Sequence, residues 1–148
     1  GAGELRHLTE ADHDFLVEWR TAYNRETMGA NQADAMQIAR EDVPKWISTA
    51  SHRLYETEEG PVCVTGFNAI FPEVVQVGGV STPQEHRGHG HAKIAVALHL
   101  KEARANGAHR SVLGSAHPSA NRVYEALGFK RVGSETLVFF NDPQRVPD

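Results

Sequence analysis

Five residues ahead of an alanine-rich apolar run have the types and spacing to bind an anion or a metal. The stretch RGHGH occupies positions 87–91, between STPQEH and AKIAVALHL. The glycines would let backbone amides approach a phosphate closely, and Arg87 would add a fixed positive charge. Histidine is also a common metal ligand, so a metal site is a second interpretation. A glycine-rich connection that binds nothing is the third.

The elements on either side of this loop favour an anion site. A strand is expected over 74–82 (VVQVGGVST), and a helix over about 89–106 follows the loop. The first turn of a helix has unpaired N–H groups and a partial positive charge, which suits a pyrophosphate. Gly78 and Gly79 inside the strand predict a bulge or a close backbone approach there.

Three other kinds of site fit the spacing less well. A Walker loop needs Gly-Lys-Ser/Thr, which is not in the sequence, and a Rossmann fingerprint needs a small residue where Lys93 stands. The metal interpretation uses four histidines, with no cysteine or acid at ligand spacing. We therefore expect solvent-exposed loop histidines and no metal site. These histidines are His86, His89, His91 and His99.

The rest of the chain alternates between helical and strand patterns. A first strand over 4–8 leads into a helix that an approximate capping box opens at Thr9 and that Gly29 ends. A second helix is expected from about Asn31, then a short third piece over 41–50 with Pro44 in its first turn. Strands over 52–57, 61–71 and 74–82 make an antiparallel meander, and a strand (110–115), a helix (117–128) and two strands (129–133, 136–141) complete an α/β fold with a mixed sheet.

Composition restricts the class of protein. With 148 residues, 40% apolar and 23% charged, residues 1–148 are expected to form a single globular domain. The formal charge of −4 provides no field for nucleic acid or an anionic membrane, and no apolar stretch approaches membrane-spanning length. The N-terminus has no signal-peptide pattern. The single cysteine, Cys63, is expected to be a small buried hydrophobe, which fits a reducing, cytoplasmic setting.

Two motifs in order resemble the signatures of the GNAT N-acetyltransferase superfamily. QEHRGHGHA (84–92) resembles the motif Arg/Gln-x-x-Gly-x-Gly/Ala, with Arg87, Gly90 and Ala92 matching. About thirty residues later, PSANRVYEALGF (118–129) resembles the second signature, a helix ending Tyr-x-x-x-Gly-Phe. The resemblance covers nearly the whole chain. It implies the GNAT fold, a mixed, mostly antiparallel sheet with helices on both faces in the order β-α-α-β-β-β-α-β-α-β-β.

Membership of this family implies acetyl-coenzyme A as co-substrate. Its pyrophosphate would then lie on the backbone amides of the glycine loop, which comprises Arg87, Gly88, His89, Gly90, His91 and Ala92. The strand before the loop would splay from its neighbour at the Gly78-Gly79 bulge. Three residues would present main-chain groups to the pantetheine arm and the thioester carbonyl: Val80, Ser81 and Thr82.

The resemblance also implies roles for side chains. Tyr124 resembles the general acid that protonates the departing sulfur. His117 stands where an asparagine usually contacts the pantetheine arm, and Asn121, four residues on, is the alternative contact. The strand before the glycine loop contains no acid, so Glu73 at its entrance is the nearest candidate base. Glu26, Asp34 and a chain of waters are the alternatives.

Three functions follow from these patterns. The leading hypothesis is transfer of acetyl from acetyl-coenzyme A to a primary amine of a small molecule or a peptide, by direct attack in a ternary complex. The second is a non-catalytic acyl-coenzyme A sensor, and the third a metal-binding protein. No nucleic-acid or membrane partner is expected. The apolar segment 136–140 would permit a homodimer, and burial within one chain would explain it equally well.

Overall fold

The computed structural model describes residues 3–71, 73–78, 80–114, 130–132 and 136–140. Seven strands form one open sheet in the order β1-β2-β3-β4-β5-β7-β6. Neighbouring strands are antiparallel except for β4 and β5, which run parallel. The strands are β1 (Glu4–His7), β2 (His52–Thr57), β3 (Gly60–Ile70), β4 (Val74–Val77), β5 (Arg110–Gly114), β6 (Lys130–Val132) and β7 (Thr136–Phe140). The predicted mixed, mostly antiparallel sheet is thus confirmed.

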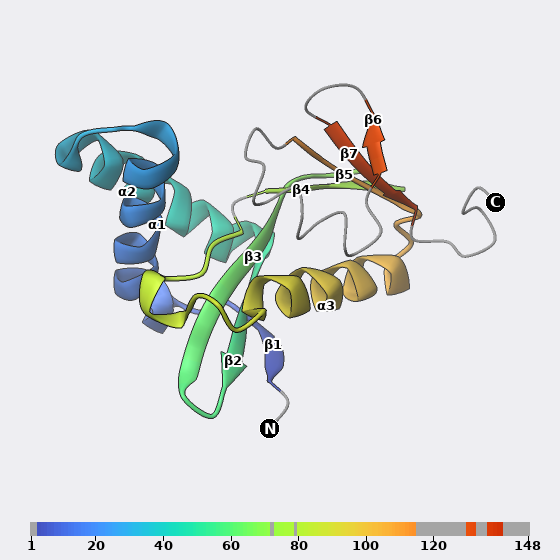
Figure 1. Ribbon diagram of the computed structural model, residues 1–148, viewed down its shortest axis with the longest axis horizontal. Coiled ribbons are helices and arrows are strands. Elements are labelled where there is room, and N and C mark those ends of the chain that lie inside the picture. The colour runs from blue at the N-terminus through green and yellow to red at the C-terminus, as the bar shows by residue number, and fades with distance from the viewer. Residues whose placement is uncertain (1–2, 72, 79, 115–129, 133–135, 141–148) are drawn as a thin grey trace.

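Helices cover both faces of the sheet, as predicted. The helices α1 (His13–Met28) and α2 (Gln32–Thr49) lie on one side of β1–β3, and α3 (His91–Ala105) lies on the other (Figure 1). Leu16, Val43 and Leu54 share one apolar cluster between α1, α2 and the sheet. A second cluster joins α3 to β3 and β4. A third cluster, which includes Tyr55, Cys63 and Ala95, joins β2 and β3 to the first turns of α3.

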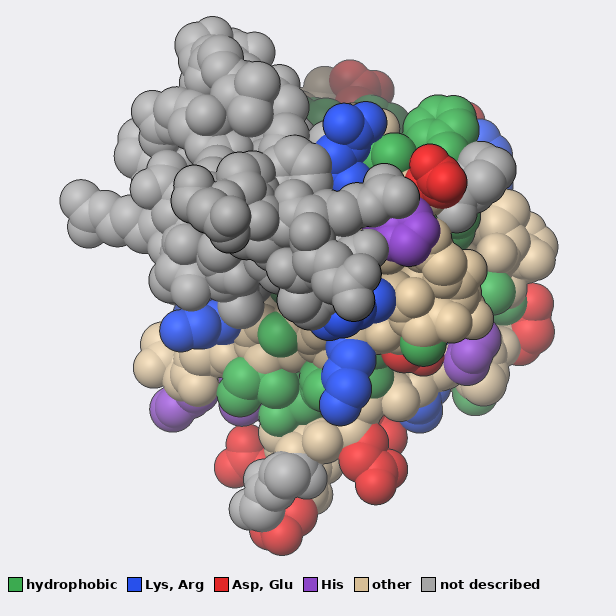
Figure 2. All heavy atoms as spheres, turned by 90° about the vertical axis from the view of Figure 1, so that its right-hand side faces the viewer, with side chains coloured by type: hydrophobic (Ala, Val, Ile, Leu, Met, Phe, Trp, Pro, Cys, Tyr) green, Lys and Arg blue, Asp and Glu red, His purple; other side chains and the backbone are tan. Residues whose placement is uncertain are grey.

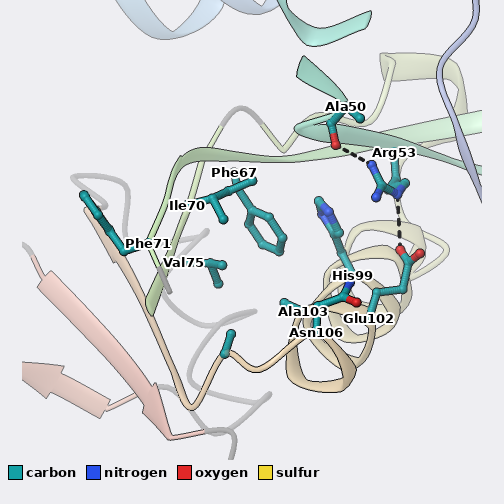
Figure 3. Close-up of a pocket in the computed structure, with 11 residues that line it drawn as sticks. Ala50, Arg53, Phe67, Ile70, Phe71, Val75, His99, Glu102, Ala103 and Asn106 are labelled. Atoms are coloured by element: carbon teal, nitrogen blue, oxygen red, sulfur yellow. Dashed lines mark hydrogen bonds and ion pairs between the residues drawn. The ribbon is translucent and has the colours of Figure 1, made fainter. Parts of the chain in front are cut away.

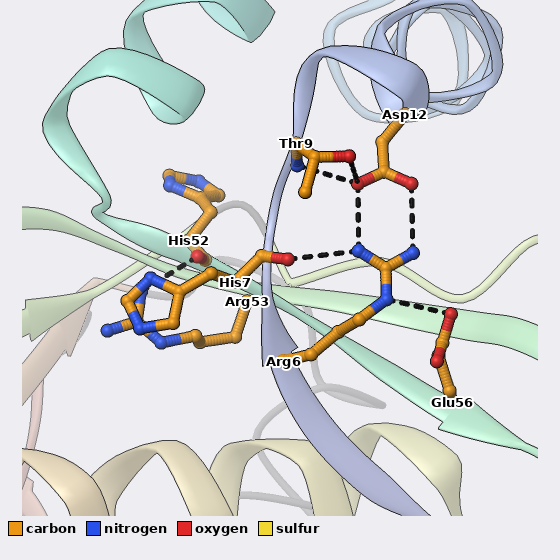
Figure 4. Close-up of polar contacts among 7 residues, drawn as sticks. All are labelled: Arg6, His7, Thr9, Asp12, His52, Arg53 and Glu56. Carbon is orange, nitrogen blue, oxygen red and sulfur yellow. Dashed lines mark hydrogen bonds and ion pairs between the residues drawn. The ribbon is translucent and has the colours of Figure 1, made fainter.

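An ion-pair network fixes the turn from β1 into α1. Thr9 N–H donates to Asp12 Oδ2 at 2.7 Å, which is the predicted capping contact before the short helical turn Glu10–Asp12. Asp12 is 4% exposed and also receives two hydrogen bonds from Arg6, at 2.8 and 2.9 Å (Figure 4). Arg6 holds Glu56 on β2 as well. These contacts lower the pKa of the Asp12 carboxyl, chiefly because Arg6 hydrogen-bonds its ionised form.

The second and third predicted helical pieces are in fact one helix. Asn31 caps α2 by accepting from Asp34 N–H at 2.9 Å, and the helix runs on to Thr49 with Pro44 inside it. Proline removes one intrahelical hydrogen bond, so the sequence suggested a break. The buried stripe of Ala35, Ala39, Val43 and Trp46 nevertheless continues on one face past Pro44. Packing of that stripe outweighs the lost hydrogen bond.

Two histidines are buried on opposite sides of the sheet. His52 stacks on Trp46 of α2 with ring centroids 4.1 Å apart, and its ring occupies the space above Gly66 on the neighbouring strand. His99 of α3 stacks on Phe67 at 3.7 Å. Each is 2% exposed. The predicted helix over about 89–106 contains His99, but the prediction that this histidine is exposed to solvent was wrong, because its ring packs on the sheet.

Charges of both signs are mixed on the described surface. Figure 2 shows the side of the molecule that lies at the right in Figure 1. Acidic and basic side chains are interspersed there, with apolar groups between them. No helix in the part of the chain that the structure describes is long and apolar enough to cross a membrane.

Candidate active site

The glycine loop leaves β4 and enters α3 through two residues with positive φ. Gly88 has φ +87° and Gly90, the residue that begins α3, has φ +76°. A side chain at either position would meet no heavy atom within 4 Å, so these glycines are set by backbone conformation and not by crowding. Both positions are exposed. The loop is therefore open on the side where a ligand would approach.

The amides of this loop are available to an anion. The hydrogen-bond ladder of α3 begins where Ile94 N–H donates to Gly90 C=O at 3.2 Å. Among the described residues, none accepts a hydrogen bond from the N–H groups of Gly88, His89 or Gly90. The Nδ1 atom of His91, in the first turn, is buried and also has no described partner. Free amides at a helix start with no acid in the first turn suit a diphosphate.

Arg87 is already held in place by two protein groups. Its Nε donates to Thr82 C=O at 2.8 Å, which ties the two ends of the segment 82–87 together. Its Nη2 lies 2.9 and 3.2 Å from the carboxylate oxygens of Glu26 on α1. The charge predicted for the anion site is therefore shared with an acid 61 residues away in sequence, a contact that no sequence pattern indicated.

The strand that enters the loop contains the register change that its glycines predicted. Gly78 N–H donates to Gly66 C=O, and further on Ser81 exchanges both main-chain hydrogen bonds with Val64, at 2.9 and 3.0 Å. The register between the two paired segments changes by one residue between these two pairs. The side chain of Asn68 fills the space beside Gly78, which leaves no room for a Cβ there.

β4 and β5 stop pairing just before this register change. Their last pair is Gln76 with Val112, although β5 goes on pairing with β7 as far as Gly114. Val80 lies between Gly78 and Ser81, where the register changes, and its N–H and C=O are the main-chain groups at this point. No described residue bonds to either group.

The three residues whose main-chain groups were predicted to contact the co-substrate therefore differ in their hydrogen bonds. Val80 has main-chain groups that no described residue bonds, Ser81 uses both of its own with Val64, and the Thr82 carbonyl accepts from Arg87. The structure brings these residues together with the loop that runs from Arg87 to Ala92.

Glu73 does not lie with this group. It precedes β4, and its carbonyl accepts from His109 N–H at 2.8 Å at the far end of the strand. Val80 is seven residue positions further along the chain, which corresponds to about 20 Å in an extended strand. Of the alternative acids, Glu26 contacts Arg87, and Asp34 bonds to Asn31 at the start of α2. The remaining predicted site residues, His117, Asn121 and Tyr124, lie outside the described residues.

A cavity lies at the other end of α3 from the glycine loop. Phe67, Val75 and Ala103 form part of its apolar wall, and His99, Arg53 and Glu102 line its polar side (Figure 3). Arg53 donates to Ala50 C=O at 2.7 Å and pairs with Glu102. The cavity is thus distinct from the loop site. Within the described ranges, no group of three or more His, Cys, Asp or Glu side chains is placed to hold a metal ion.

Three acetyltransferases are among the solved structures that share this fold. Spermidine N-acetyltransferase from Vibrio cholerae, in complex with CoA and spermine, superposes with a TM-score of 0.76 at 17% identity, covering 94% of this chain and 95% of the other. A GNAT family acetyltransferase from Brucella melitensis, in complex with acetyl-CoA, gives 0.69 at 18% identity over 95% and 89%. PaiA N-acetyltransferase from Thermoplasma acidophilum, with coenzyme A, gives 0.71 at 14% over 93% and 98%.

Sequence comparison gives the family directly. A search of curated protein sequences returns no match to the chain. The family model described as "Acetyltransferase (GNAT) family" matches residues 8–129, which include both helices of the N-terminal half, the glycine loop and the second motif. The two neighbours named first share the fold over 94% and 95% of this chain. The chain belongs to the GNAT family of acetyltransferases.

Proposed function

We propose that this chain transfers an acetyl group from acetyl-CoA to a primary amine by direct attack in a ternary complex. The observation that carries the proposal is the pair of free main-chain sites on one connection. These are the amides of residues 88–90 in the glycine loop and the main-chain groups of Val80, none of which has a partner in the part of the chain that the structure describes. The bound CoA in three structural neighbours supports the same co-substrate here.

Acetyl-CoA would supply an acetyl group already activated as a thioester. The amides from Gly88 to Ala92 would hold its diphosphate at the positive end of α3. The N–H of Val80 would donate to the acetyl carbonyl oxygen and stabilise the negative charge that develops there as the amine attacks. The C–N bond forms, the C–S bond breaks, and Tyr124 would give a proton to the departing sulfur.

The attacking amine must be neutral and must lose a proton as the amide forms. Glu73 is not proposed as its acceptor, because β4 carries it about 20 Å from Val80. A water held beside the main chain of Val80 is the simplest proton acceptor that this geometry allows. The acceptor class is a primary amine, and the spermine in one neighbour makes polyamines the first compounds to test.

The first test is calorimetric titration with acetyl-CoA of the parent chain, Gly90→Glu and Gly60→Glu. Gly90→Glu places a carboxylate at the loop, and we expect it to abolish micromolar binding. Gly60, in the turn between β2 and β3, is the matched control, because it also has positive φ (+96°) and open space around it. Gly60→Glu should keep binding.

Thiol release with a panel of amines then separates the enzyme from a sensor. The parent chain should release CoA thiol with at least one amine, and Tyr124→Phe should slow that release. Binding without release for any amine would favour the sensor. If the parent chain does not bind acetyl-CoA, the glycine loop is only a connection and the proposal fails.

A further inference from the structure

The loop that offers its amides to a diphosphate has little packing to hold it in shape. Gly88 and Gly90 have open space around them, and residues 87–90 are exposed. A loop with two glycines loses much conformational freedom when it is ordered, and a ligand that orders it binds more weakly. Contacts that order the loop in advance therefore strengthen binding.

The contacts that order this loop meet at Arg87. Two backbone bonds, from His86 N–H to Pro83 C=O and from Arg87 N–H to Gln84 C=O, make one helical turn before the glycines. The Arg87 side chain then reaches back to Thr82 C=O at 2.8 Å. The guanidinium at its far end is held by Glu26, which belongs to α1 and is distant from the loop in sequence.

We propose that Glu26 is a positioning residue, which holds the glycine loop in its diphosphate-binding shape by anchoring Arg87 to α1. Glu26 lies on a helix of sixteen residues whose inner face is packed in the core, through Leu16 and Asn24. Asn24 is fully buried and donates to Ala35 C=O of α2 at 3.1 Å. The helix that carries Glu26 is therefore packed into the core, whereas the glycine loop lacks such packing. Arg87 Nη1 keeps no described protein partner and stays available to an anion.

The sign of the effect separates this role from simple electrostatics. Glu26 is a negative charge near a site for an anion, so its neutralisation would by itself tighten the binding of acetyl-CoA. A positioning role predicts the opposite result, because Arg87 and the loop lose their anchor. Both side chains of the pair are about half exposed (48% and 47%), so the effect is that of a surface ion pair.

The experiment compares Glu26→Gln with Glu18→Gln, an exposed acid two turns earlier on the same helix. Calorimetry should show acetyl-CoA binding about two- to five-fold weaker in Glu26→Gln, and unchanged or slightly tighter in Glu18→Gln. In an Arg87→Met background, Glu26→Gln should no longer weaken binding. In turnover, KM for acetyl-CoA should rise while kcat is retained. Equal or tighter binding by Glu26→Gln would overturn the proposal, and so would a fall in kcat with unchanged binding, which would make Glu26 a base.

Hydrogen exchange of the ligand-free chain tests the anchor without any cofactor. Amides of residues 82–92 should exchange faster in Glu26→Gln than in the parent or in Glu18→Gln, while those of β2 and β3 stay the same. No change in this segment would refute the positioning role. The inference rests on the proposed function, and the two can fail separately. If the parent does not bind acetyl-CoA, the proposed function is wrong. If Glu26→Gln leaves hydrogen exchange of the loop unchanged, the positioning role of Glu26 is wrong.

Discussion

Lowering the pH from 7 to 5 should destabilise this protein through the two histidines that are buried on opposite faces of the sheet. Burial lowers the pKa of His52 to about 3, with the charges of Arg20 and Arg53 adding to the effect. Burial lowers the pKa of His99 to about 3 as well, with Arg53 as the next cause. Both rings stay neutral in the folded chain at pH 5, whereas in the unfolded chain, with a pKa near 6.5, both take up protons.

The magnitude follows from proton linkage. When the pKa of a histidine is lower in the folded chain than in the unfolded chain, protons bind the unfolded chain preferentially. The free energy of unfolding therefore decreases as the pH falls through the unfolded pKa. Between pH 7 and pH 5 each histidine contributes a loss of about 2 kcal/mol, and the pair about 4 kcal/mol. The loss hardly depends on the folded pKa as long as that value stays below about 4. Asp12, with its lowered pKa, loses its contribution only at more acid pH, below its usual value of 3.8.

The assay is urea unfolding at pH 7 and pH 5, by fluorescence of Trp19 and Trp46, for the parent, His99→Gln and Phe67→Leu. His99→Gln removes one titrating ring and should halve the loss in free energy of unfolding, to about 2 kcal/mol. Phe67→Leu disturbs the same stack but keeps both histidines, so it should lower stability at both pH values and retain the full loss. The reasoning is refuted if the parent is equally stable at both pH values, or if His99→Gln retains the whole difference.

Three further predictions concern single positions. Gly66→Ala should lower the free energy of unfolding by about 1–3 kcal/mol in urea, because its Cβ would meet the His52 ring, and His52→Ala should recover part of that loss. Asp12→Asn should lower it by about 2 kcal/mol at pH 7, because two hydrogen bonds from Arg6 to a carboxylate are weakened, and the difference from the parent should shrink below pH 4. Cys63 should react with a thiol reagent at pH 8 at least about a hundred-fold more slowly in the native chain than in urea, since burial raises its pKa to about 11; comparable rates would contradict its burial.

Local patterns predicted the elements of the fold well. The strand at His52–Thr57 has the predicted bounds, and Gly29 ends α1 with φ +63° as its place in the sequence suggests. The capping contact between Thr9 and Asp12 was also predictable, because it spans only three residues. Cys63 is fully buried within β3, as its apolar neighbours indicated.

The errors and omissions have a common physical cause, which is contact between distant parts of the chain. Pro44 is a local signal for a helix start, and the buried stripe that carries α2 past it is a tertiary effect. His99 resembled the loop histidines in sequence, but its helix turns it onto Phe67. At the candidate site, a glycine loop before a helix was predictable, whereas the pairing of Arg87 with Glu26 depends on how α1 is placed.

The space that His52 takes above Gly66 has a consequence for how this sequence can change. Glycine at 66 is required only while the histidine ring lies over it. A substitution to a smaller residue at 52 would open room at 66 for an ordinary strand residue, whereas the reverse order passes through a strained intermediate. The two positions should therefore show epistasis. Substitution at 52 followed by 66 should be tolerated, whereas substitution at 66 first should destabilise the protein.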